Sequence, residues 1–296
     1  MLTHTFPEQT LPTRAVIMGA GGFVGAAIGR RLETRGVPVL ALTRRQVDLL
    51  ATGAAERLSG LLRADDAFVA VSAIAPVKTP AMLRDNLVMI EAMTEALKAQ
   101  PVAHVLNIGS DAVFADSKGP LSENSCRAPG SLHGIMHLAR EVMFAEAAGA
   151  TPLATLRPTL IYGLDDPHNG YGPNRFRRLA AEGQDLVLFG EGEERRDHVW
   201  VEDVAELALR ILLHRSHGSL NAATGTVISF RAAAEAIAKL SGRNPVIKGS
   251  PRSGPMPHDG YRPFDPQATA DAFPDFTYMP PLDGFARVQA AAGENS

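Results

Sequence analysis

Features typical of secreted, membrane-bound or disulfide-stabilised proteins are scarce in this chain of 296 residues. Its single cysteine, Cys126, excludes an intramolecular disulfide and a zinc cluster built on cysteines, and it favours a reducing, cytoplasmic location. The most apolar stretch, residues 67–77, is too short and too interrupted to span a bilayer. Because residues 1–14 contain no apolar leader segment, we expect a protein that is neither secreted nor membrane-bound.

Positive charge is not in excess either. The chain has 29 Lys and Arg against 32 Asp and Glu, a formal net charge of −3, and no basic block alternates with aromatic residues. The electrostatic signature of a nucleic-acid-binding protein is therefore missing, and we expect no nucleic acid partner. With 45% hydrophobic residues, the composition is that of a globular protein with a sizeable core.

Strand-like and helix-like segments alternate along the first half of the chain. The apolar runs predicted to be buried strands are residues 15–18, 37–42, 67–73, 104–108, 154–156 and 160–162. Helical spacing of apolar residues marks 23–32, 83–99 and 132–148, and later 176–182, 202–213 and 230–240. This alternation predicts an α/β fold with a doubly wound parallel sheet that helices cover on both faces.

A long polar, turn-rich segment after Gly163 indicates a domain boundary. We expect a first domain over residues 13–165 and a smaller second domain mainly over 166–288, with 197–215 packing back on the first. Residues 1–12 and 289–296 lack a periodic pattern and are predicted to be loosely held tails.

Three glycines lie between the first predicted strand and the first predicted helix, at Gly19, Gly22 and Gly25. Glycines there allow a tight turn and let backbone N–H groups at the helix N-terminus approach a pyrophosphate. A strand before the turn and a helix after it, beginning with Phe23 and Val24, predict a dinucleotide site.

The end of the second predicted strand indicates which dinucleotide binds. Thr43, Arg44 and Arg45 stand where a carboxylate would accept hydrogen bonds from the ribose of NAD. Two guanidinium groups can instead hold a 2′-phosphate, so the sequence predicts NADP, with NAD less favoured. The alternative is that the two arginines are exposed to solvent on a surface loop and bind no ligand.

Together with later motifs, these residues resemble the extended short-chain dehydrogenase/reductase superfamily, in particular its NAD(P)-dependent epimerase/dehydratase family of the nucleotide-sugar type. The further matching segments are residues 46–49, 71–75, Asn86, 107–114, 157–163 and 189–205. The resemblance runs from Val16 to about Val288. It implies a Rossmann domain that binds NADP, a smaller C-terminal α/β substrate domain, and an epimerase, dehydratase or ketoreductase acting on a nucleotide-linked sugar.

The resemblance also assigns roles to individual residues. The implied cofactor contacts are Gly19, Gly22, Phe23, Val24, Gly25, Thr43, Arg44, Arg45, Asp48, Leu49, Ser72, Ala73, Ile74 and His137. Ser110 takes the place of the catalytic hydroxyl. Arg196 matches the arginine that contacts the substrate diphosphate, and the alternative is that it pairs with a carboxylate and only braces the fold. Polar loop residues and neighbours of the motifs complete the expected substrate site, namely Asp111, Tyr162, Tyr171, Asn174 and Arg175. For Asp111 a structural hydrogen bond at the end of its strand is an equal alternative. The resemblance further implies a homodimer formed through helices 83–99 and 132–148. The alternative is that the apolar faces of these helices cover the sheet.

The chain departs from the family where the chemistry is expected. Aligned on Pro129, Gly134 and Glu141, the Tyr-x-x-x-Lys pair is replaced by His133 and His137. In one interpretation His133 is a substitute acid/base, because an imidazole with an ordinary pKa of about 6.5 titrates near neutral pH without help.

Two other interpretations stay open. The protein could be a catalytically weakened NADP-binding structural or regulatory protein of the same fold, because a fold can outlast its chemistry. A histidine pair spaced by four residues also has zinc geometry, but the sequence identifies no third ligand, so we predict no metal.

Overall fold

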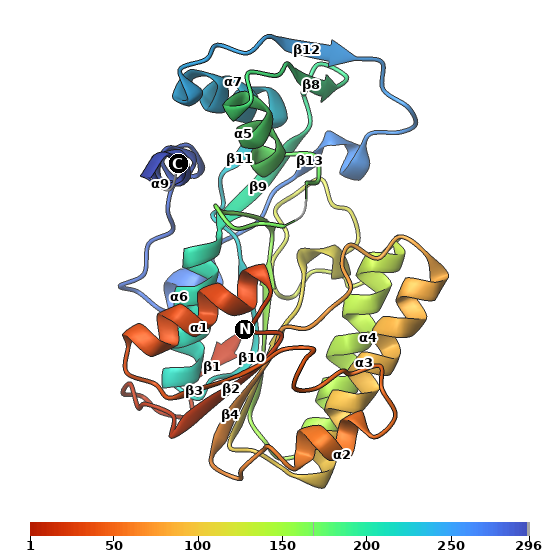
Figure 1. Cartoon of the computed structure of the whole chain (residues 1–296), viewed down its shortest axis with the longest axis vertical. Coiled ribbons are helices and arrows are strands. Elements are labelled where there is room, and N and C mark those ends of the chain that lie inside the picture. The colour runs from red at the N-terminus through yellow and green to blue at the C-terminus, as the bar shows by residue number, and fades with distance from the viewer. Residues whose placement is uncertain (168, 295–296) are drawn as a thin grey trace.

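The structure is a computed structural model that describes residues 1–167 and 169–294. In this part of the chain a seven-stranded sheet has the order β1-β10-β6-β5-β4-β2-β3 (Figure 1). The strands are β1 Leu2–Thr3, β2 Arg14–Met18, β3 Val39–Leu42, β4 Asp66–Ala70, β5 His104–Ile108, β6 Leu153–Pro158 and β10 His217–Ala222. All neighbours are parallel except β1, which runs antiparallel to β10. The predicted doubly wound parallel sheet is confirmed.

Helices cover both faces of this sheet, which explains the continuous apolar runs of its strands. On one face α1 Phe23–Thr34 packs against α6 Val201–Leu213, and on the other lie α2 Ala54–Ser59, α3 Pro80–Ala99 and α4 Leu132–Ala148 (Figure 1). Each face has its own cluster of buried apolar side chains. None of the described helices combines the length and the apolar composition needed to cross a bilayer.

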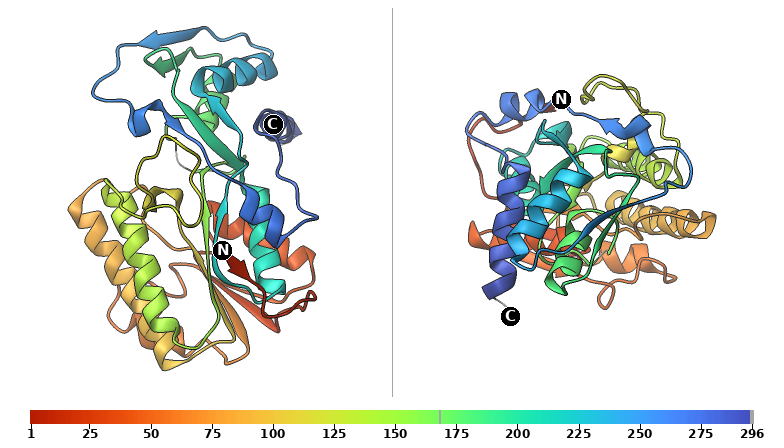
Figure 2. Two further views of the ribbon diagram at one scale, coloured as in Figure 1. Left: turned by 180° about the vertical axis from the view of Figure 1, so that it is seen from behind. Right: turned by 90° about the horizontal axis from the view of Figure 1, so that it is seen from above.

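A smaller second lobe lies at one end of the sheet (Figure 2). It contains β7 Leu160–Tyr162, β9 Arg195–Trp200, β11 Val227–Ser229 and β13 Tyr261–Arg262 in one sheet, and β8 Leu186–Phe189 with β12 Ile247–Ser250 in another. Helices α5 Pro173–Ala181, α7 Phe230–Ser241 and α9 Pro281–Glu294 surround a third apolar cluster. The short elements η1 Asp111–Val113, η2 Pro257–Gly260 and α8 Gln267–Ala272 complete the described chain.

The chain passes between the two lobes several times, so the lobes are not two continuous stretches of sequence. After β9, helix α6 packs on the first lobe and β10 joins the large sheet beside β6. The segment after β13 returns to the first lobe, where Phe273 is part of the buried cluster around α1 and α6. Parallel strands need a crossover connection, and here the crossover from β6 to β10 contains part of the second lobe.

Both segments predicted to be tails contain regular secondary structure in the described part of the chain. Leu2 and Thr3 form β1 on the open edge of β10, and the Phe6 N–H donates to the carbonyl of His214. Pairing at an exposed sheet edge satisfies backbone groups there. At the other end, residues 289–294 continue α9, whose Phe285 and Val288 are buried in the second lobe. Residues 295–296 lie outside the described residues.

Candidate active site

The glycine turn connects β2 with α1 beside the neighbouring strands. Gly19 has a left-handed φ of 103°, and a Cβ there would come within 2.7 Å of the Ser72 nitrogen. A Cβ at Gly25 would lie 2.2 Å from the carbonyl oxygen of Gly19, while a Cβ at Gly22 would meet only that oxygen at 3.4 Å. Gly19 and Gly25 are therefore required by the closeness of the backbone, whereas space remains around Gly22.

Helix α1 begins after this turn without a side-chain cap. The first backbone N–H groups of a helix, here those of Phe23 and Val24, have no acceptor within the helix. Such an N-terminus favours an anion. The turn lies at the carboxyl end of β2, between β3 on one side and β4 on the other, which is the switch point of a doubly wound sheet. A dinucleotide pyrophosphate fits this arrangement.

The segment after β3 is held by its own side chains. The Thr43 N–H donates to the Gln46 side chain at 3.0 Å, and Arg44 Nε lies 3.1 Å from Asp48 Oδ2. The Arg44 side chain is 79% exposed, and Arg45 is exposed as well. A hydrogen bond from the Leu50 N–H, and then Arg44, lower the pKa of Asp48.

The loop after β4 is fixed from α3. Asn86 is buried, its Oδ1 accepts the Ile74 N–H at 2.9 Å, and its Nδ2 donates to the Ile74 carbonyl at 3.0 Å. Ser72 and Ala73 precede this clamp, and the Ser72 N–H donates to the Met18 carbonyl at 2.9 Å. The loop is thus held both by α3 and by the end of β2.

Ser110 lies at the carboxyl end of β5 as the N-cap of η1, where its hydroxyl accepts the Ala112 N–H at 3.2 Å. Its neighbour Asp111 is buried, and Arg262 Nε donates to its carboxylate at 2.9 Å. Arg262 comes from β13 of the second lobe, is 2% exposed, and also donates to the Asp111 carbonyl at 2.7 Å and to Asp116 at 3.0 Å.

The sequence interpretation missed Arg262. The only signal for it in the sequence is an arginine in a loop rich in Gly, Pro and Ser, and nothing there indicates a partner 151 residues away.

Helix α4 begins against this same turn. Ser131 caps it by accepting the Gly134 N–H at 3.1 Å. A Cβ on Gly134 would lie 2.2 Å from the Ala112 carbonyl oxygen, so the helix start contacts the turn directly. His133 lies in this first turn of the helix, where the Asp111 carboxylate acts on it. Its Nδ1 accepts the Val77 N–H at 3.4 Å.

The two histidines contact one another one helical turn apart. The rings of His133 and His137 are perpendicular, with centroids 4.7 Å apart. Burial lowers the pKa of His133, and the nearby Asp111 carboxylate partly opposes this. The pKa of His137 lies well below the ordinary value, first because of burial and then because of His133 and Arg140. The buried Nδ1 of His137 has no hydrogen-bond partner within the described residues.

Two arginines are buried around α4, one on β6 and one on the helix itself. Arg157 on β6 forms two hydrogen bonds with Glu141, at 2.7 and 2.8 Å, inside the protein. Arg140 is fully buried, and its hydrogen-bond acceptors are the Asn107 side chain and two backbone carbonyls. Burial lowers the pKa of Arg140 to about 10, so that it stays charged at neutral pH.

The predicted substrate residues are not all brought to this site. Tyr162 is 1% exposed and packs on Phe285 of α9, so a substrate cannot reach it unless α9 moves, which corrects that prediction. Asn174 is also buried. Its side chain is occupied by the protein itself, since it accepts the Gly163 N–H at 3.1 Å and donates to Asp166 at 2.7 Å.

The remaining three lie in the second lobe. Tyr171 stacks on Phe189 with ring centroids 4.4 Å apart, and Arg175 is exposed on α5. Arg196 on β9 donates to Glu194 at 3.1 Å and stands in register with Arg262 on β13. Residues paired in parallel strands point to the same side, so both arginines face the region of Asp116.

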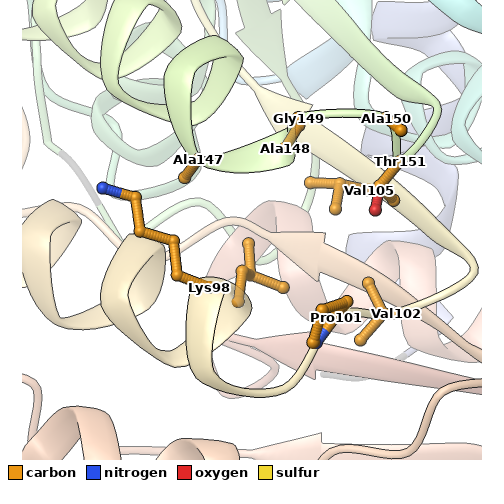
Figure 3. Close-up of a pocket in the computed structure, with 10 residues that line it drawn as sticks. Lys98, Pro101, Val102, Val105, Ala147, Ala148, Gly149, Ala150 and Thr151 are labelled. Carbon is orange, nitrogen blue, oxygen red and sulfur yellow. The ribbon is translucent and has the colours of Figure 1, made fainter.

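A cavity of about 380 Å³ lies elsewhere, between the C-terminal ends of α3 and α4 (Figure 3). Apolar residues line most of it, and its one charged residue, Lys98, pairs with Glu146 at 2.8 Å. None of the residues discussed above lines it. Within the described part of the chain, no group of three or more His, Cys, Asp or Glu side chains is arranged to hold a metal ion.

Comparisons with known proteins agree with this arrangement. A sequence profile described as the NAD dependent epimerase/dehydratase family matches residues 15–223. The chain is similar to GDP-L-fucose synthase of Escherichia coli (strain K12), with 26% identity over 269 residues that cover 77% of this chain and 81% of that protein.

Solved structures show the same fold at lower identity. UDP-glucose 4-epimerase from Thermotoga maritima, solved with UDP-glucose, has a TM-score of 0.85 and 18% identity, covering 95% of this chain and 99% of that chain. UDP-glucuronic acid 4-epimerase from Bacillus cereus, solved with UDP-glucuronic acid and NAD, has a TM-score of 0.81 and 18% identity, covering 96% of this chain and 100% of that chain.

Proposed function

The chain belongs to the NAD dependent epimerase/dehydratase family, and we propose that it is an NADP-dependent epimerase, dehydratase or ketoreductase acting on a nucleotide-linked sugar. The observation that carries this proposal is the close approach of the start of α4 to the turn after β5, where a Cβ on Gly134 would lie 2.2 Å from the Ala112 carbonyl oxygen and where the Asp111 carboxylate acts on His133. A titratable imidazole, a hydroxyl and a carboxylate then belong to two elements that meet at the end of the sheet that carries the glycine turn.

In this proposal the cofactor lies across the carboxyl ends of β2 and β4. The backbone of Gly22, Phe23 and Val24 holds the pyrophosphate, and Arg44 and Arg45 hold a 2′-phosphate of the adenosine. Asp48 is turned to Arg44, so no free carboxylate of this segment competes for the ribose. When bound, the nicotinamide accepts or donates the hydride.

His133 acts as the acid/base. Its lowered pKa leaves it neutral at pH 7, so it can accept the proton of a sugar hydroxyl during oxidation and return it during reduction. Ser110 orients the same sugar oxygen through its hydroxyl, and Asp111 favours the imidazolium that forms. His137 contacts the ribose of the nicotinamide.

The second lobe binds the nucleotide part of the substrate. Arg196 contacts the diphosphate, because a bidentate guanidinium suits phosphate oxygens. The alternative is that its pair with Glu194, at 3.1 Å, only braces the fold. Tyr171 and Arg175 belong to the same lobe and supply further contacts.

Titration of NADP and NAD tests the cofactor part of this proposal. The double variant Arg44→Ala/Arg45→Ala should weaken NADP binding by about 1.5–3 kcal/mol, the value of a charge-assisted hydrogen bond, and leave NAD binding unchanged. Arg57→Ala, at an exposed arginine of α2, is the matched control. Tighter binding of NAD than of NADP by the native protein would show that the cofactor assignment is wrong.

The replacement of Tyr and Lys by His133 and His137 favours a second candidate, a catalytically weakened NADP-binding structural or regulatory protein. The fluorescence of bound NADPH distinguishes the two candidates. An enzyme should change that fluorescence when a UDP-, GDP- or dTDP-sugar is added, and should turn over at least one of them. Retained NADPH binding with no response to any such sugar would favour the second candidate.

We further propose a cytoplasmic homodimer. Apolar side chains are exposed on the outer surface of the α3 and α4 pair, namely Val88, Ile135 and Val142. A second copy of the pair would cover them. Sedimentation equilibrium of the native protein and of Val142→Glu checks this, and a monomeric native protein would exclude it.

A further inference from the structure

Arg262 of the second lobe binds the turn after β5, residues 110–114, here called the Ser110 turn. The Arg262 side chain is 2% exposed and donates to both a carboxylate and backbone oxygens of this turn. Its Nε donates to Asp111 Oδ2 at 2.9 Å, and its Nη2 donates to the carbonyl oxygens of Asp111 at 2.7 Å and of Phe114 at 3.3 Å. One guanidinium therefore binds oxygens near both ends of the Ser110 turn.

The backbone hydrogen bonds within the Ser110 turn are long. The Val113 N–H donates to the Ser110 carbonyl at 3.4 Å, and the Phe114 N–H donates to the Asp111 carbonyl at 3.2 Å. These distances lie at or beyond the upper end of the ordinary range, and a 3₁₀ turn has poorer hydrogen-bond geometry than an α-helix. The charge-assisted bond of 2.7 Å from Arg262 is of a stronger kind. We therefore expect the conformation of this turn to depend on Arg262.

Asp111 is the buried partner of the Arg262 charge. Its side chain is 11% exposed, whereas Asp116, which accepts from Arg262 Nη1 at 3.0 Å, has 56% of its side chain exposed. Exposed ion pairs contribute little, because water competes for both groups. In a buried pair, removing either partner leaves an uncompensated charge inside the protein. Arg262 thus fixes the direction of the Asp111 carboxylate.

Asp111 also connects Arg262 to the proposed catalytic groups. While Oδ2 of Asp111 binds Arg262, its Oδ1 lies 3.5 Å from the Ser110 hydroxyl. The Ser110 hydroxyl accepts the Ala112 N–H at 3.2 Å, and the Ala112 carbonyl oxygen closely approaches Gly134 at the start of α4. A displacement of Asp111 would therefore disturb both the Ser110 hydroxyl and the contact with α4.

We propose that Arg262 is a positioning residue, which holds the Ser110 turn in its working conformation from the second lobe through Asp111 and the two backbone carbonyls. This inference rests on the role proposed for Ser110 in the reaction. Arg262 on β13 is in register with Arg196 on β9, the residue proposed to contact the substrate diphosphate. The lobe proposed to bind the nucleotide then also fixes the hydroxyl that orients the sugar oxygen.

Hydrogen exchange of the protein without cofactor or substrate tests whether Arg262 holds the turn. The key variant is Arg262→Lys, which keeps the charge but replaces the planar fork by a point charge that cannot bind the carboxylate and both carbonyls at once. The backbone amides of residues 112–115, which are hydrogen-bonded in the native protein, should exchange about tenfold faster in the variant, as for the loss of about one hydrogen bond. Unchanged exchange would overturn the proposal.

Two control variants make this result specific. Arg14 donates to both carboxylate oxygens of the buried Asp66, at 2.8 and 2.6 Å, at the opposite end of the sheet. Arg14→Lys therefore alters a similar pair away from the turn and should leave the exchange of residues 112–115 unchanged. Asp116→Asn alters only the exposed partner of Arg262 and should also leave it unchanged. Equal acceleration by Arg14→Lys would indicate a general loss of stability and would contradict a local role.

A double-mutant cycle tests whether Arg262 acts through Ser110. Arg262→Lys should lower kcat by about 10²-fold, the cost of a misplacement of about 1 Å at a reacting group, and should change KM less. In the Ser110→Ala background the same substitution should have little further effect on kcat, because residues that act as a unit are not additive. Fully additive effects would show that Arg262 does not position Ser110, which a purely structural role would produce.

The two measurements separate this inference from the proposed function. Should no nucleotide sugar be turned over, the proposed function fails, and hydrogen exchange still decides whether Arg262 holds the turn. An active enzyme whose turn exchanges normally in Arg262→Lys would leave the proposed function standing and exclude the role of Arg262. If Arg262→Lys does not fold, Asp111→Asn/Arg262→Gln replaces it, because that pair leaves no uncompensated charge and should show the same faster exchange.

Discussion

A group of histidines lies at each end of the strands of the central sheet, one at the amino ends and one at the carboxyl ends. The two groups differ in what their ring nitrogens contact. At the amino ends of the strands, His4 binds the Ser216 hydroxyl at 2.7 Å and the Ala272 carbonyl at 2.9 Å. His104 binds the Ser216 carbonyl at 2.7 Å, and His214 binds the Phe6 carbonyl at 2.9 Å. His4 and His214 hold the N-terminal segment against the rest of the first lobe, and His104 joins β5 to the residue before β10.

At the carboxyl ends the histidines have almost no such partners. His133 receives one hydrogen bond, at 3.4 Å from the Val77 N–H, and the buried Nδ1 of His137 receives none within the described residues. A ring nitrogen that is bonded to the backbone helps to hold the fold. The buried Nδ1 of His104 also has no partner among the described residues, so a missing partner alone does not separate the two groups. We predict that the histidines at the amino ends are structural and that His133 and His137 are functional, and each of the following changes tests that prediction.

The largest effect is expected from His133→Ala. General acid/base catalysis contributes typically about 10²–10⁴-fold, so kcat should fall by that factor while the affinity for NADP stays nearly the same. The measurement is steady-state turnover of whichever nucleotide sugar proves to be a substrate, together with cofactor titration. His214→Ala, at the other edge, is the matched control and should retain its kcat. An equal loss of kcat in the His133→Ala and His214→Ala variants would show that the two groups of histidines do not differ in function.

The second effect is on stability in acid. Burial lowers the pKa of His104 to about 4, below the ordinary value of 6.5. Between these two pKa values the unfolded chain binds a proton at His104 that the folded protein does not bind. The contribution of His104 to the free energy of unfolding is therefore fully present above pH 6.5 and is lost as the pH falls toward 4. A difference of this size corresponds to about 3 kcal/mol.

The His104→Gln variant isolates this contribution from that of other buried histidines. Urea unfolding measured from about pH 7 to 4 should show a pH slope for the variant that is smaller by about one proton. An unchanged slope would mean that His104 is protonated in the folded protein.

A smaller effect is expected from His4→Ala. The variant loses two hydrogen bonds, each worth about 0.5–1.5 kcal/mol, so the free energy of unfolding should fall by about 1–3 kcal/mol. Turnover should not change, because His4 lies at the edge of the sheet away from the glycine turn. Thermal unfolding and an activity assay on the same sample check both parts, and a large loss of turnover in the folded variant would contradict the structural role.

The smallest effect is expected at two helix caps. Ser131 caps α4 and Thr79 caps α3, and replacing either by alanine should cost about 1 kcal/mol of stability. Ser131→Ala should also lower turnover, because His133 lies in the capped turn, while Thr79→Ala should not. If both variants lose stability and neither loses turnover, the start of α4 does not position a catalytic group.

The strands, the principal helices and the glycine turn could be predicted from the sequence because their signals are local. The apolar run of residues 15–18 and the helical spacing of 132–148 correspond to β2 and α4 as observed. Burial on both faces of a parallel strand and on one face of a helix requires those patterns. Gly19 and Gly25 belong to the same category, since a close backbone approach leaves no room for a Cβ.

The sequence by itself thus determined the order of the elements, the turn expected to bind a dinucleotide and the unusual His133 and His137. Only the tertiary structure decided what surrounds them: the pairing of Arg262 with Asp111, the burial of Tyr162 under α9, and the unpaired charge of Arg140. The physical reason is that periodicity and turn chemistry act between residues a few positions apart. Residues 33 or 151 positions apart, such as Asn107 with Arg140 and Asp111 with Arg262, come into contact only when the strands and lobes are packed. No pattern among neighbouring residues in the sequence predicts such a contact.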